Sequence, residues 1–176
     1  MNVTVFGGSS PKPGSQAYQQ AYTLGENLAR AGHSVLTGGY IGTMEAVSRG
    51  AAEANGHVIG VTCSQIENWR PVKVNAWVHE ERNFISLQDR LFELITNCDV
   101  ALALPGGPGT LTEISLTWNL MIINAIPKKP LILIGKEWLL VMNSFYQALS
   151  DYCHPDQNNL LLFANDIKAA YSMLET

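Results

Sequence analysis

The sequence predicts an α/β protein built around a parallel sheet, on three observations. Short β-rich runs alternate with longer amphipathic patterns along the whole chain, which is typical of βαβ units. Clusters of glycine directly follow several of the β-rich runs. The 176 residues are 47% hydrophobic and 15% charged, which suffices for one large core, so we expect a single domain over residues 1–176.

The expected strands are short runs rich in β-branched and aliphatic residues, each bounded by turn-forming residues. A rhythm of strand, glycine-rich turn and helix repeats twice before Cys63 and indicates parallel pairing. The expected strands are Asn2–Phe6, Ser34–Thr37, His57–Thr62, Asp99–Leu104 and Leu131–Ile134.

The expected helices follow from apolar residues spaced three and four apart and from capping signals. Ser86 with Asp89 three residues later is a capping-box pattern that opens one of them. From Cys63 to Asn83 neither periodicity holds, so we expect a long irregular connection, a kind of loop that is often functional. The expected helices run from Ala17 to Gly32, Met44 to Gly56, Ser86 to Ile95, Thr110 to about Asn124, and on both sides of Cys153–Pro155.

Charge and cysteine content exclude several classes of partner. The chain has 11 Lys and Arg against 15 Asp and Glu, a net charge of -4 and no basic run, so we do not expect nucleic acid as a partner. It shows neither a signal peptide nor an apolar run of about 18 residues, so we expect neither export nor membrane insertion. Three scattered cysteines without a C-x-x-C pair predict reduced thiols in the cytoplasm and no metal site.

Glycines gather at three predicted strand ends, within residues 7–8, 38–42 and 106–109. The carboxyl ends of parallel strands meet at one edge of the sheet, where open α/β sheets bind ligands. Backbone N–H groups in such turns, together with the N-terminus of the next helix, favour an anion such as phosphate. The expected phosphate- or nucleotide-binding residues are Gly8, Ser9, Gly39, Gly42, Gly106, Gly107, Gly109 and Thr110.

The alternative is that strand-to-helix turns simply favour glycine. This alternative is stronger for the first cluster than for the third, which adds Thr110 as a hydroxyl donor at a helix start, and Ser9 fits an ordinary turn equally well. No cluster fits G-x-x-x-x-G-K-[ST] or G-x-G-x-x-G, so neither an ATPase loop nor a dinucleotide fingerprint is indicated. We therefore expect the phosphate of a smaller ligand.

Two charged residues lie within apolar helical patterns. Arg90 borders the stripe of Leu87 and Leu91, and a buried guanidinium requires a carboxylate or a ligand phosphate as its partner. Glu113 lies in the expected first turn of a helix with apolar residues on opposite sides, which predicts that this helix is largely buried. The plain alternatives are an ordinary ion pair for Arg90 and an interaction with the helix dipole for Glu113.

Two tryptophans of the irregular stretch, Trp69 and Trp77, have two interpretations. They are suited to stack on a purine or close a lid, but tryptophans of this kind are more often packing residues or interface anchors. The histidines and the Cys153–His154 pair lack partners with the spacing of a catalytic triad or a metal site.

The stretch from Pro105 to Glu113, PGGPGTLTE, resembles the PGGxGTxxE signature of the LOG (Lonely Guy) family, once labelled possible lysine decarboxylases. Residues 38–44, GGYIGTM, are similar to the family's GGxxGxM motif, and residues 6–10, FGGSS, to its opening strand and turn. Together these matches span most of residues 1–134.

The resemblance implies a Rossmann-like, doubly wound sheet with helices on both faces, assembled as a homodimer or a higher homo-oligomer. It also implies hydrolysis of a nucleoside 5'-monophosphate of the AMP type to free base and ribose 5-phosphate, a reaction that activates cytokinins in plants and some bacteria. The family's catalytic pair corresponds to Arg90 and Glu113. Leu91 follows Arg90 where the family commonly has lysine or asparagine, so the identity of the base stays open.

For this reaction we assign Glu113 to stabilise an oxocarbenium-like state or activate water, and Arg90 to position the ligand, since a guanidinium stays protonated. We expect no cofactor, because no lysine has the context of a pyridoxal Schiff base. Two other classes of function stay open: a non-catalytic nucleotide or molybdenum-cofactor carrier on the same fold, and a regulatory protein.

Overall fold

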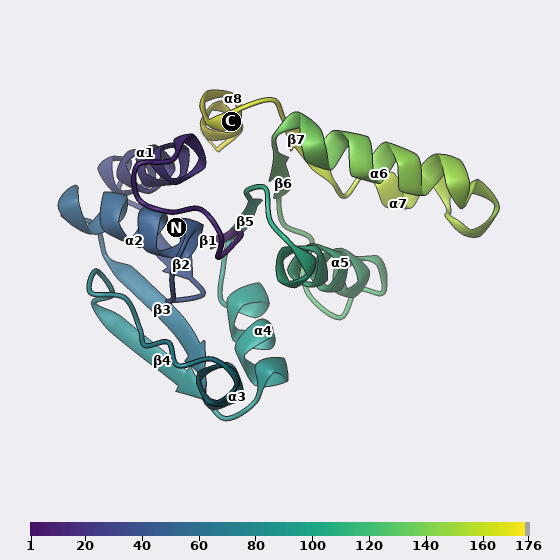
Figure 1. Cartoon of the computed structure of the whole chain (residues 1–176). Helices are drawn as coiled ribbons and strands as arrows, with labels where there is room; N and C mark the ends of the chain where they lie inside the picture. The colour runs from purple at the N-terminus through teal and green to yellow at the C-terminus, as the bar shows by residue number, and fades with distance from the viewer. Residues whose placement is uncertain (175–176) are drawn as a thin grey trace.

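Within residues 1–174, the part of the chain that the computed structural model describes, a seven-stranded sheet forms the middle layer (Figure 1). Every neighbouring pair of strands is parallel, in the order β4-β3-β2-β1-β5-β6-β7. The predicted Rossmann-like class with a doubly wound parallel sheet is therefore confirmed. The strands are β1 (Asn2–Phe6), β2 (Ser34–Thr37), β3 (Val58–Cys63), β4 (Glu80–Phe84), β5 (Val100–Ala103), β6 (Leu131–Ile134) and β7 (Leu162–Ala164).

Helices connect the strands and several begin where the sequence signals a cap. The Ser15 hydroxyl accepts from the Tyr18 N–H, and the Ser86 hydroxyl accepts from the Asp89 N–H, so the predicted cap at Ser86 is confirmed. The helices of the described residues are α1 (Gln16–Arg30), α2 (Thr43–Glu53), α3 (Ser64–Trp69), α4 (Leu87–Thr96), α5 (Pro108–Ile122), α6 (Lys136–Ala148), the 3-10 helix η1 (Ser150–Tyr152), α7 (Pro155–Asn158) and α8 (Ile167–Ser172).

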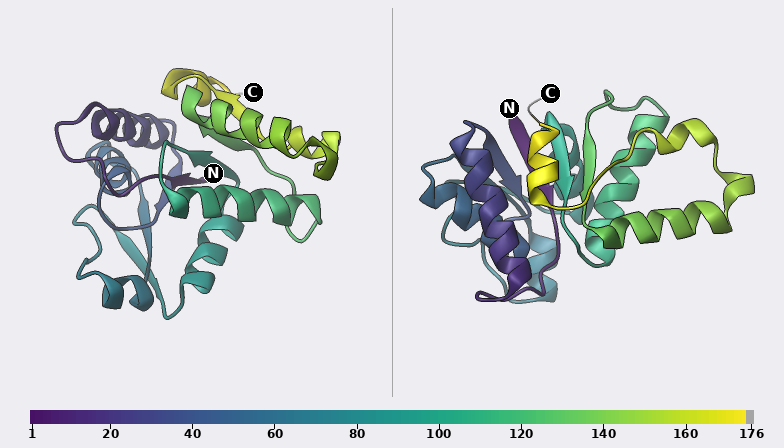
Figure 2. Two further views of the ribbon diagram at one scale, coloured as in Figure 1. Left: turned by 45° about the vertical axis from the view of Figure 1, so that its right-hand side comes forward. Right: turned by 90° about the horizontal axis from the view of Figure 1, so that it is seen from above.

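Two apolar cores lie on opposite faces of the sheet, because successive strand side chains alternate between the faces. Val3 and Val5 of β1 pack with buried residues of α1 and α2, whereas Phe6 packs with buried residues of α4 and α5. Figures 1 and 2 show α1, α2 and α8 on one side of the sheet and α4, α5 and α6 on the other. No helix in this described range is long and apolar enough to cross a membrane.

Residues 63–83 contain more regular structure than the sequence predicts. Helix α3 follows β3 at once, and β4 begins at Glu80 and pairs with β3 along its whole length, so the expectation of an irregular connection is wrong at both ends. Strand β4 lacks an apolar run because it lies at the edge of the sheet, where charged side chains face solvent and discourage pairing with other chains. The short strand β7 at the opposite edge is also absent from the predictions.

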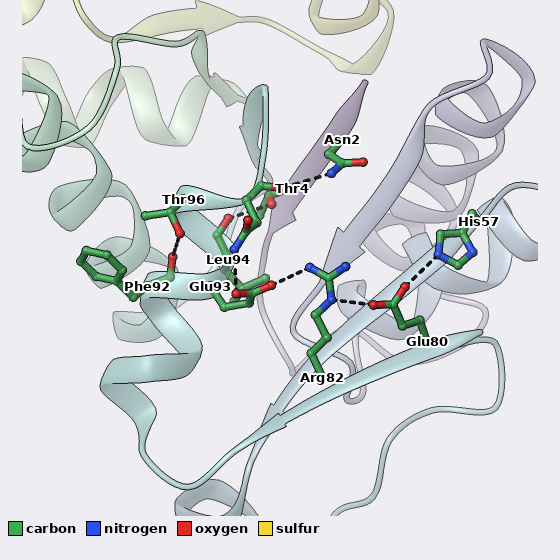
Figure 3. A network of polar contacts seen from close by, with 10 residues as sticks. Asn2, Thr4, His57, Glu80, Arg82, Phe92, Glu93, Leu94 and Thr96 are labelled. Atoms are coloured by element: carbon green, nitrogen blue, oxygen red, sulfur yellow. Dashed lines mark hydrogen bonds and ion pairs between the residues drawn. The ribbon is translucent and has the colours of Figure 1, made fainter.

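A polar network attaches this edge strand to helix α4 (Figure 3). The Arg82 guanidinium of β4 donates to Glu93 of α4 at 2.6 Å and to Glu80 at 2.7 Å. Glu80 also lies 3.2 Å from the His57 ring. The network holds α4 alongside β3 and β4, which positions the residues that α4 carries near the ends of these strands.

The order of the strands creates a switch point at β1. From β1 the sheet grows through β2 and β3 to β4, and α4 then returns the chain to the other side of β1, where β5 pairs. The connection after β1 leads to the face of α1, and the connection after β5 leads to the face of α5 (Figure 1). In open α/β sheets such a point leaves a crevice outside the carboxyl ends of the strands.

Candidate active site

A cavity of about 390 Å³ opens at this switch point. Segments that are far apart in the sequence meet around it, and the first and third glycine clusters lie on its walls. We call it the switch-point cavity. Its lining residues are Gly7–Ser10 after β1, Tyr40 and Met44 at the start of α2, Ile66, Trp69 and Arg70 in and after α3, Arg90 in α4, and Gly107–Thr110 and Glu113 in α5.

The backbone after β1 and the backbone after β5 approach each other closely. A Cβ atom at Gly8 would lie 3.3 Å from the Cα atom of Gly106. A Cβ atom at Gly106 would lie 2.2 Å from the Thr110 hydroxyl oxygen and 3.0 Å from the Gly8 nitrogen. Glycine at these two positions therefore has a steric reason beyond a general preference for turns.

Helix α5 begins without a side-chain cap at the mouth of the cavity. Gly107 is its N-cap residue and provides no side chain, and Pro108 is the first helical residue. A Cβ atom at Gly107 or at Gly109 would meet nothing within 4 Å, so the space outside the first turn is open. The first N–H groups of a helix have no partner within it and carry partial positive charge, so this end of α5 is suited to bind an anion.

The glycines of the second motif shape the cavity without lining it. Gly39 and Gly42 adopt φ values of 75° and 77°, which side chains disfavour. A Cβ atom at Gly42 would lie 2.5 Å from the Gly8 carbonyl oxygen, which accepts hydrogen bonds from the Thr43 N–H and hydroxyl at 2.9 and 3.0 Å. The motif thus positions the turn after β1 and presents Tyr40 to the cavity.

Arg90 is buried, with 5% of its surface exposed, and its guanidinium is held by two strand ends. Its Nε donates to the Val61 carbonyl at 2.8 Å and its Nη2 donates to the Gly38 carbonyl at 3.1 Å. The guanidinium also lies 5.6 Å from the centre of the Tyr40 ring. A Cβ atom at Gly38 would come within 2.1 Å of Nη2, so glycine at that position makes room for Arg90.

Glu113 faces Arg90 across the floor of the cavity. Its Oε1 lies 3.9 Å from the Arg90 Nη1, and only 8% of the residue is exposed. Burial raises the pKa of Glu113 from 4.5 to about 7, and the nearby Arg90 guanidinium opposes this rise. A carboxyl group that changes protonation near neutral pH is suited to transfer protons.

Glu113 lies in the second turn of α5 rather than in the predicted first turn, because the helix begins at Pro108. It is buried together with Thr110 and Thr117 at helical spacing, whereas Leu111 is 42% exposed, so the helix is less buried than its apolar pattern predicts. The buried face of the helix therefore combines these polar residues with the core residues Ile114, Trp118 and Met121, and the polar residues near its start face the cavity.

The predicted binding residues divide into two groups in the structure. Gly8, Ser9, Gly107, Gly109 and Thr110 line the cavity together with Arg90 and Glu113. In contrast, Gly39, Gly42 and Gly106 lie behind its walls, where they allow the close approaches described above.

The sequence patterns did not single out Tyr40, Ile66 or Arg70 as site residues. Tyr40 is buried, and its hydroxyl accepts from the Cys63 N–H at 2.8 Å, which attaches the second glycine motif to the end of β3. Burial raises the pKa of this hydroxyl to about 12, so it stays protonated. An aromatic residue inside a GGxxGxM motif was the available signal for Tyr40, whereas Ile66 and Arg70 lie in a segment with no recognised pattern.

The two tryptophans of the same segment lie in different environments. Trp69 lines the switch-point cavity and is 79% exposed. Trp77 lies outside the cavity lining, and its ring stacks under the Arg49 guanidinium at 5.3 Å. The packing interpretation therefore applies to Trp77, and the ligand interpretation stays open for Trp69.

A larger cavity of about 890 Å³ lies farther along the same edge of the sheet, beyond β5. It is lined by α1, by the ends of β5 and β6, and by the turn before α8, and we call it the β5–β7 cavity. Its charged residues Lys136, Glu137 and Asp166 are all exposed. We place the candidate active site in the smaller switch-point cavity, because only that one of the two contains buried charged side chains.

Residues 1–155 match the SLOG cluster4 family. The chain belongs to this family. Across the part of the chain described here, no three His, Cys, Asp or Glu side chains lie close enough together to hold a metal ion.

The resemblance to LOG proteins is confirmed. Relatives of this SLOG protein include proteins named cytokinin riboside 5'-monophosphate phosphoribohydrolases. A probable cytokinin riboside 5'-monophosphate phosphoribohydrolase of Oryza sativa subsp. japonica is 35% identical over 151 residues, which cover 84% of this chain and 56% of that protein. A second protein of the same name and organism is 30% identical over 176 residues, covering 98% and 77%. The chain thus spans only a little more than half the length of the first of these relatives.

Solved structures with the same fold carry a different name. The molybdenum cofactor binding protein of Rippkaea orientalis superposes with a TM-score of 0.76 at 27% identity, covering 99% of this chain and 94% of that one. The molybdenum cofactor carrier protein of Chlamydomonas reinhardtii gives a TM-score of 0.72 at 24% identity, covering 99% and 95%, and shows the fold alone. The sequence relatives are therefore named for hydrolysis, whereas these structural neighbours are named for cofactor binding or transport.

Proposed function

We propose that this SLOG protein hydrolyses the N-glycosidic bond of a nucleoside 5'-monophosphate, releasing the free base and ribose 5-phosphate. The observation that carries the proposal is the buried pair of Arg90 and Glu113 on the floor of the switch-point cavity, with facing atoms 3.9 Å apart, beside the uncapped start of α5. The relatives named cytokinin riboside 5'-monophosphate phosphoribohydrolases support the choice of reaction.

The 5'-phosphate would bind at the start of α5. The open space outside Gly107 and Gly109 exposes the first N–H groups of the helix, and the helix dipole favours a dianion there. The hydroxyls of Thr110 and Ser9 lie on the same cavity and would add hydrogen bonds. Because Glu113 is one turn farther along α5 than Gly109, this placement brings the ribose next to the carboxyl group.

Glu113 would act on the ribose carbon C1' and the attacking water. In the reaction the bond between C1' and the base nitrogen breaks, its electron pair leaves with the base, and C1' develops positive charge before a water oxygen attacks it. An ionised carboxylate beside C1' stabilises that charge and takes a proton from the water, and the base gains a proton as it leaves. A pKa near 7 allows the Glu113 carboxylate to accept this proton and to release it again at neutral pH.

Arg90 would position the carboxylate and the ligand. Its Nε and Nη2 are already bonded to the ends of β3 and β2, so the guanidinium has a fixed orientation, while Nη1 faces Glu113. A fixed positive charge favours the ionised form of Glu113 and attracts an anionic ligand. Arg90 stays protonated throughout and is therefore a positioning residue in this scheme.

Incubation of the purified protein with a panel of nucleoside monophosphates, including AMP, GMP, IMP, CMP, UMP and an N6-isopentenyl AMP, tests the proposal. Chromatography of the products should reveal free base and an equal amount of ribose 5-phosphate from at least one nucleotide. Tight binding of nucleotides with no release from any of them would overturn the hydrolase.

A second candidate function is a carrier of a nucleotide or of molybdenum cofactor, supported by the likeness to the Rippkaea orientalis protein at a TM-score of 0.76. A carrier requires the anion-binding start of α5 but no titrating carboxyl group. The variant Glu113→Gln separates the two candidates, because it should abolish base release by an enzyme and leave ligand retention by a carrier unchanged.

We also propose that the protein forms a homodimer or a higher homo-oligomer. Exposed apolar side chains in α5, directly after it and in α6 support this, including Leu111, Ile123 and Leu140, of which Ile123 and Leu140 are 64% and 68% exposed. Contiguous apolar surface is typical of protein interfaces. Sedimentation equilibrium at several protein concentrations should give a mass of at least two chains, and a monomer at all concentrations would exclude the assembly.

A further inference from the structure

One wall of the switch-point cavity has no role in the proposed mechanism. It consists of α3 and the residue that follows it, and it contributes Ile66, Trp69 and Arg70 to the lining. Trp69 is exposed, and the Arg70 guanidinium lies 5.7 Å from the centre of its ring. The wall thus presents an apolar surface, an aromatic face and a positive charge to a single cavity.

Arg70 has an unused donor. Its Nε atom is buried and has no hydrogen-bond partner among the described residues. Buried N–H groups nearly always have a partner, because leaving one unpaired costs free energy. Since the side chain lines the cavity, a ligand bound there is the available source of an acceptor.

The proposed mechanism assigns the start of α5, Glu113 and Arg90 to the phosphate, the ribose and protein partners. The start of α5 is suited to the phosphate, and Glu113 lies one turn farther on, next to the ribose. Arg90 uses two of its nitrogen atoms on strand carbonyls. The base is the one part of a nucleoside monophosphate that these contacts leave unassigned. The wall formed by α3 and Arg70 is the part of the lining that is free to contact it.

We propose that Trp69 and Arg70 form the base subsite and that Arg70 selects a 6-oxopurine nucleotide, such as GMP or IMP, over AMP. This inference rests on the proposed function and names its substrate class. A guanidinium has five N–H donors and no acceptor, and it pairs in bidentate fashion with the O6 and N7 acceptors of guanine. Adenine and its N6-substituted forms place an N–H donor where O6 would be, so Arg70 opposes them. The base therefore differs from the AMP type that the family resemblance implies.

Rates of base release from GMP, IMP and AMP, compared as kcat/KM, test the selection. The wild-type protein should prefer GMP and IMP over AMP by about tenfold or more, the size expected for one bidentate contact. The variant Arg70→Gln should lose about tenfold or more on GMP and IMP and little on AMP, because a glutamine amide both accepts from N6 and donates to N7. Trp69→Ala should lower the rates for all three purines alike, since stacking does not distinguish them.

A matched control is Arg49→Gln. Arg49 also stacks on a tryptophan, Trp77, at 5.3 Å, but it lies outside the cavity lining and pairs with Glu53 at the surface. This variant should keep the rates and the preference of the wild-type protein. If Arg70→Gln lowers the rates for GMP, IMP and AMP equally, and weakens inhibition by ribose 5-phosphate as much, then Arg70 contacts the phosphate and the inference is overturned.

Equilibrium binding separates this inference from the proposed function. Calorimetry with GMP and AMP on the wild-type and Arg70→Gln proteins measures selection without catalysis. If GMP binds more tightly than AMP only when Arg70 is present, but no base is released from any nucleotide, the selection stands and the hydrolase fails. If bases are released without preference, the hydrolase stands and the selection fails, and absence of binding by both nucleotides overturns both.

Discussion

Two cavities open on the same edge of the sheet, and the difference between them supports one of them as the candidate site. Each lies beside a helix that begins at an uncapped glycine, Gly107 for α5 and Gly135 for α6. The β5–β7 cavity is the larger, at about 890 Å³ against about 390 Å³, yet its charged side chains are all exposed to solvent. The switch-point cavity holds Arg90 and Glu113 with 5% and 8% of their surfaces exposed. The comparison teaches that buried charge, rather than volume or a free helix end, marks the place for chemistry.

Burial of this pair is not an efficient way to stabilise the protein. Removing two charges from water costs several kcal/mol per ion, and well-packed apolar residues often stabilise a core as well or better. The distance of 3.9 Å between Arg90 and Glu113 is also long for a strong ion pair. We propose that a ligand approaches both residues and accounts for this arrangement. The following predictions test the contrast between the two cavities.

The largest expected effect is on turnover in Glu113→Gln. The amide has nearly the shape of the acid but transfers no proton, so base release should fall by about 10²- to 10⁴-fold with nucleotide affinity retained. Product chromatography and calorimetry measure the two quantities. The matched control is Glu137→Gln, which removes an exposed carboxylate of the β5–β7 cavity and should leave both unchanged. Equal losses in the two variants would remove the distinction between the cavities.

The next effect is on folding in Arg90→Met. Loss of the guanidinium leaves the carbonyls of Val61 and Gly38 without their donors and Glu113 without its cation. The free energy of unfolding should fall by about 3–5 kcal/mol, as for other broken buried pairs. Urea denaturation at pH 7.5 measures it, and the double variant Arg90→Met with Glu113→Gln should recover part of the loss. An unchanged midpoint would show that the pair is solvated after all.

The stability of the protein should depend on pH through Glu113. Its pKa in the folded protein is about 7, above the ordinary value of 4.5, so the folded state binds more protons between these values. The contribution to stability is complete below pH 4.5 and is lost as pH rises to about 7, by about 3 kcal/mol at most. Thermal unfolding from pH 4 to 8 should show this decline in the wild-type protein and a flatter profile in Glu113→Gln.

The rate of base release should depend on pH in the opposite direction. The proposed base must be ionised, so kcat/KM should rise through pH 7 and level off above it. Rates measured from pH 5 to 9 should give an ascending limb with an apparent pKa near 7. A rate that falls over this range would indicate that Glu113 acts as an acid instead.

The smallest expected effects are on the stability of alanine variants at two neighbouring glycines, Gly106 and Gly107. In Gly106→Ala the new methyl group would lie 2.2 Å from the Thr110 hydroxyl and 3.0 Å from the Gly8 nitrogen, so overpacking should cost about 1–3 kcal/mol of stability. In Gly107→Ala the methyl group would meet nothing within 4 Å, so stability should change by less than about 0.5 kcal/mol. Both variants should weaken nucleotide binding, and equal stabilities would show that the two loops do not touch.

Much of the fold could be predicted from local patterns. The run Leu131–Ile134 and the cap at Ser86 are confirmed because an apolar strand and a capping serine depend on neighbouring residues alone. Strand β4 escaped prediction because its residues, EERNF, become a strand only through pairing with β3. Arg70 escaped prediction for a similar reason, since nothing in its neighbourhood indicates that it borders a cavity with Arg90 and Glu113.

The sequence by itself determined the alternation of strands and helices, the glycine clusters at the strand ends, and the candidacy of Arg90 and Glu113. Only the tertiary structure decided which glycine clusters line the cavity, because strand order is set by pairing between distant segments. It also decided the properties of the pair. The carbonyl partners of Arg90 lie 29 and 52 residues away in the chain, and the pKa of Glu113 is raised to about 7 by burial that distant elements provide. Hydrogen bonds between distant residues and loss of water are properties of packing, which no local pattern specifies.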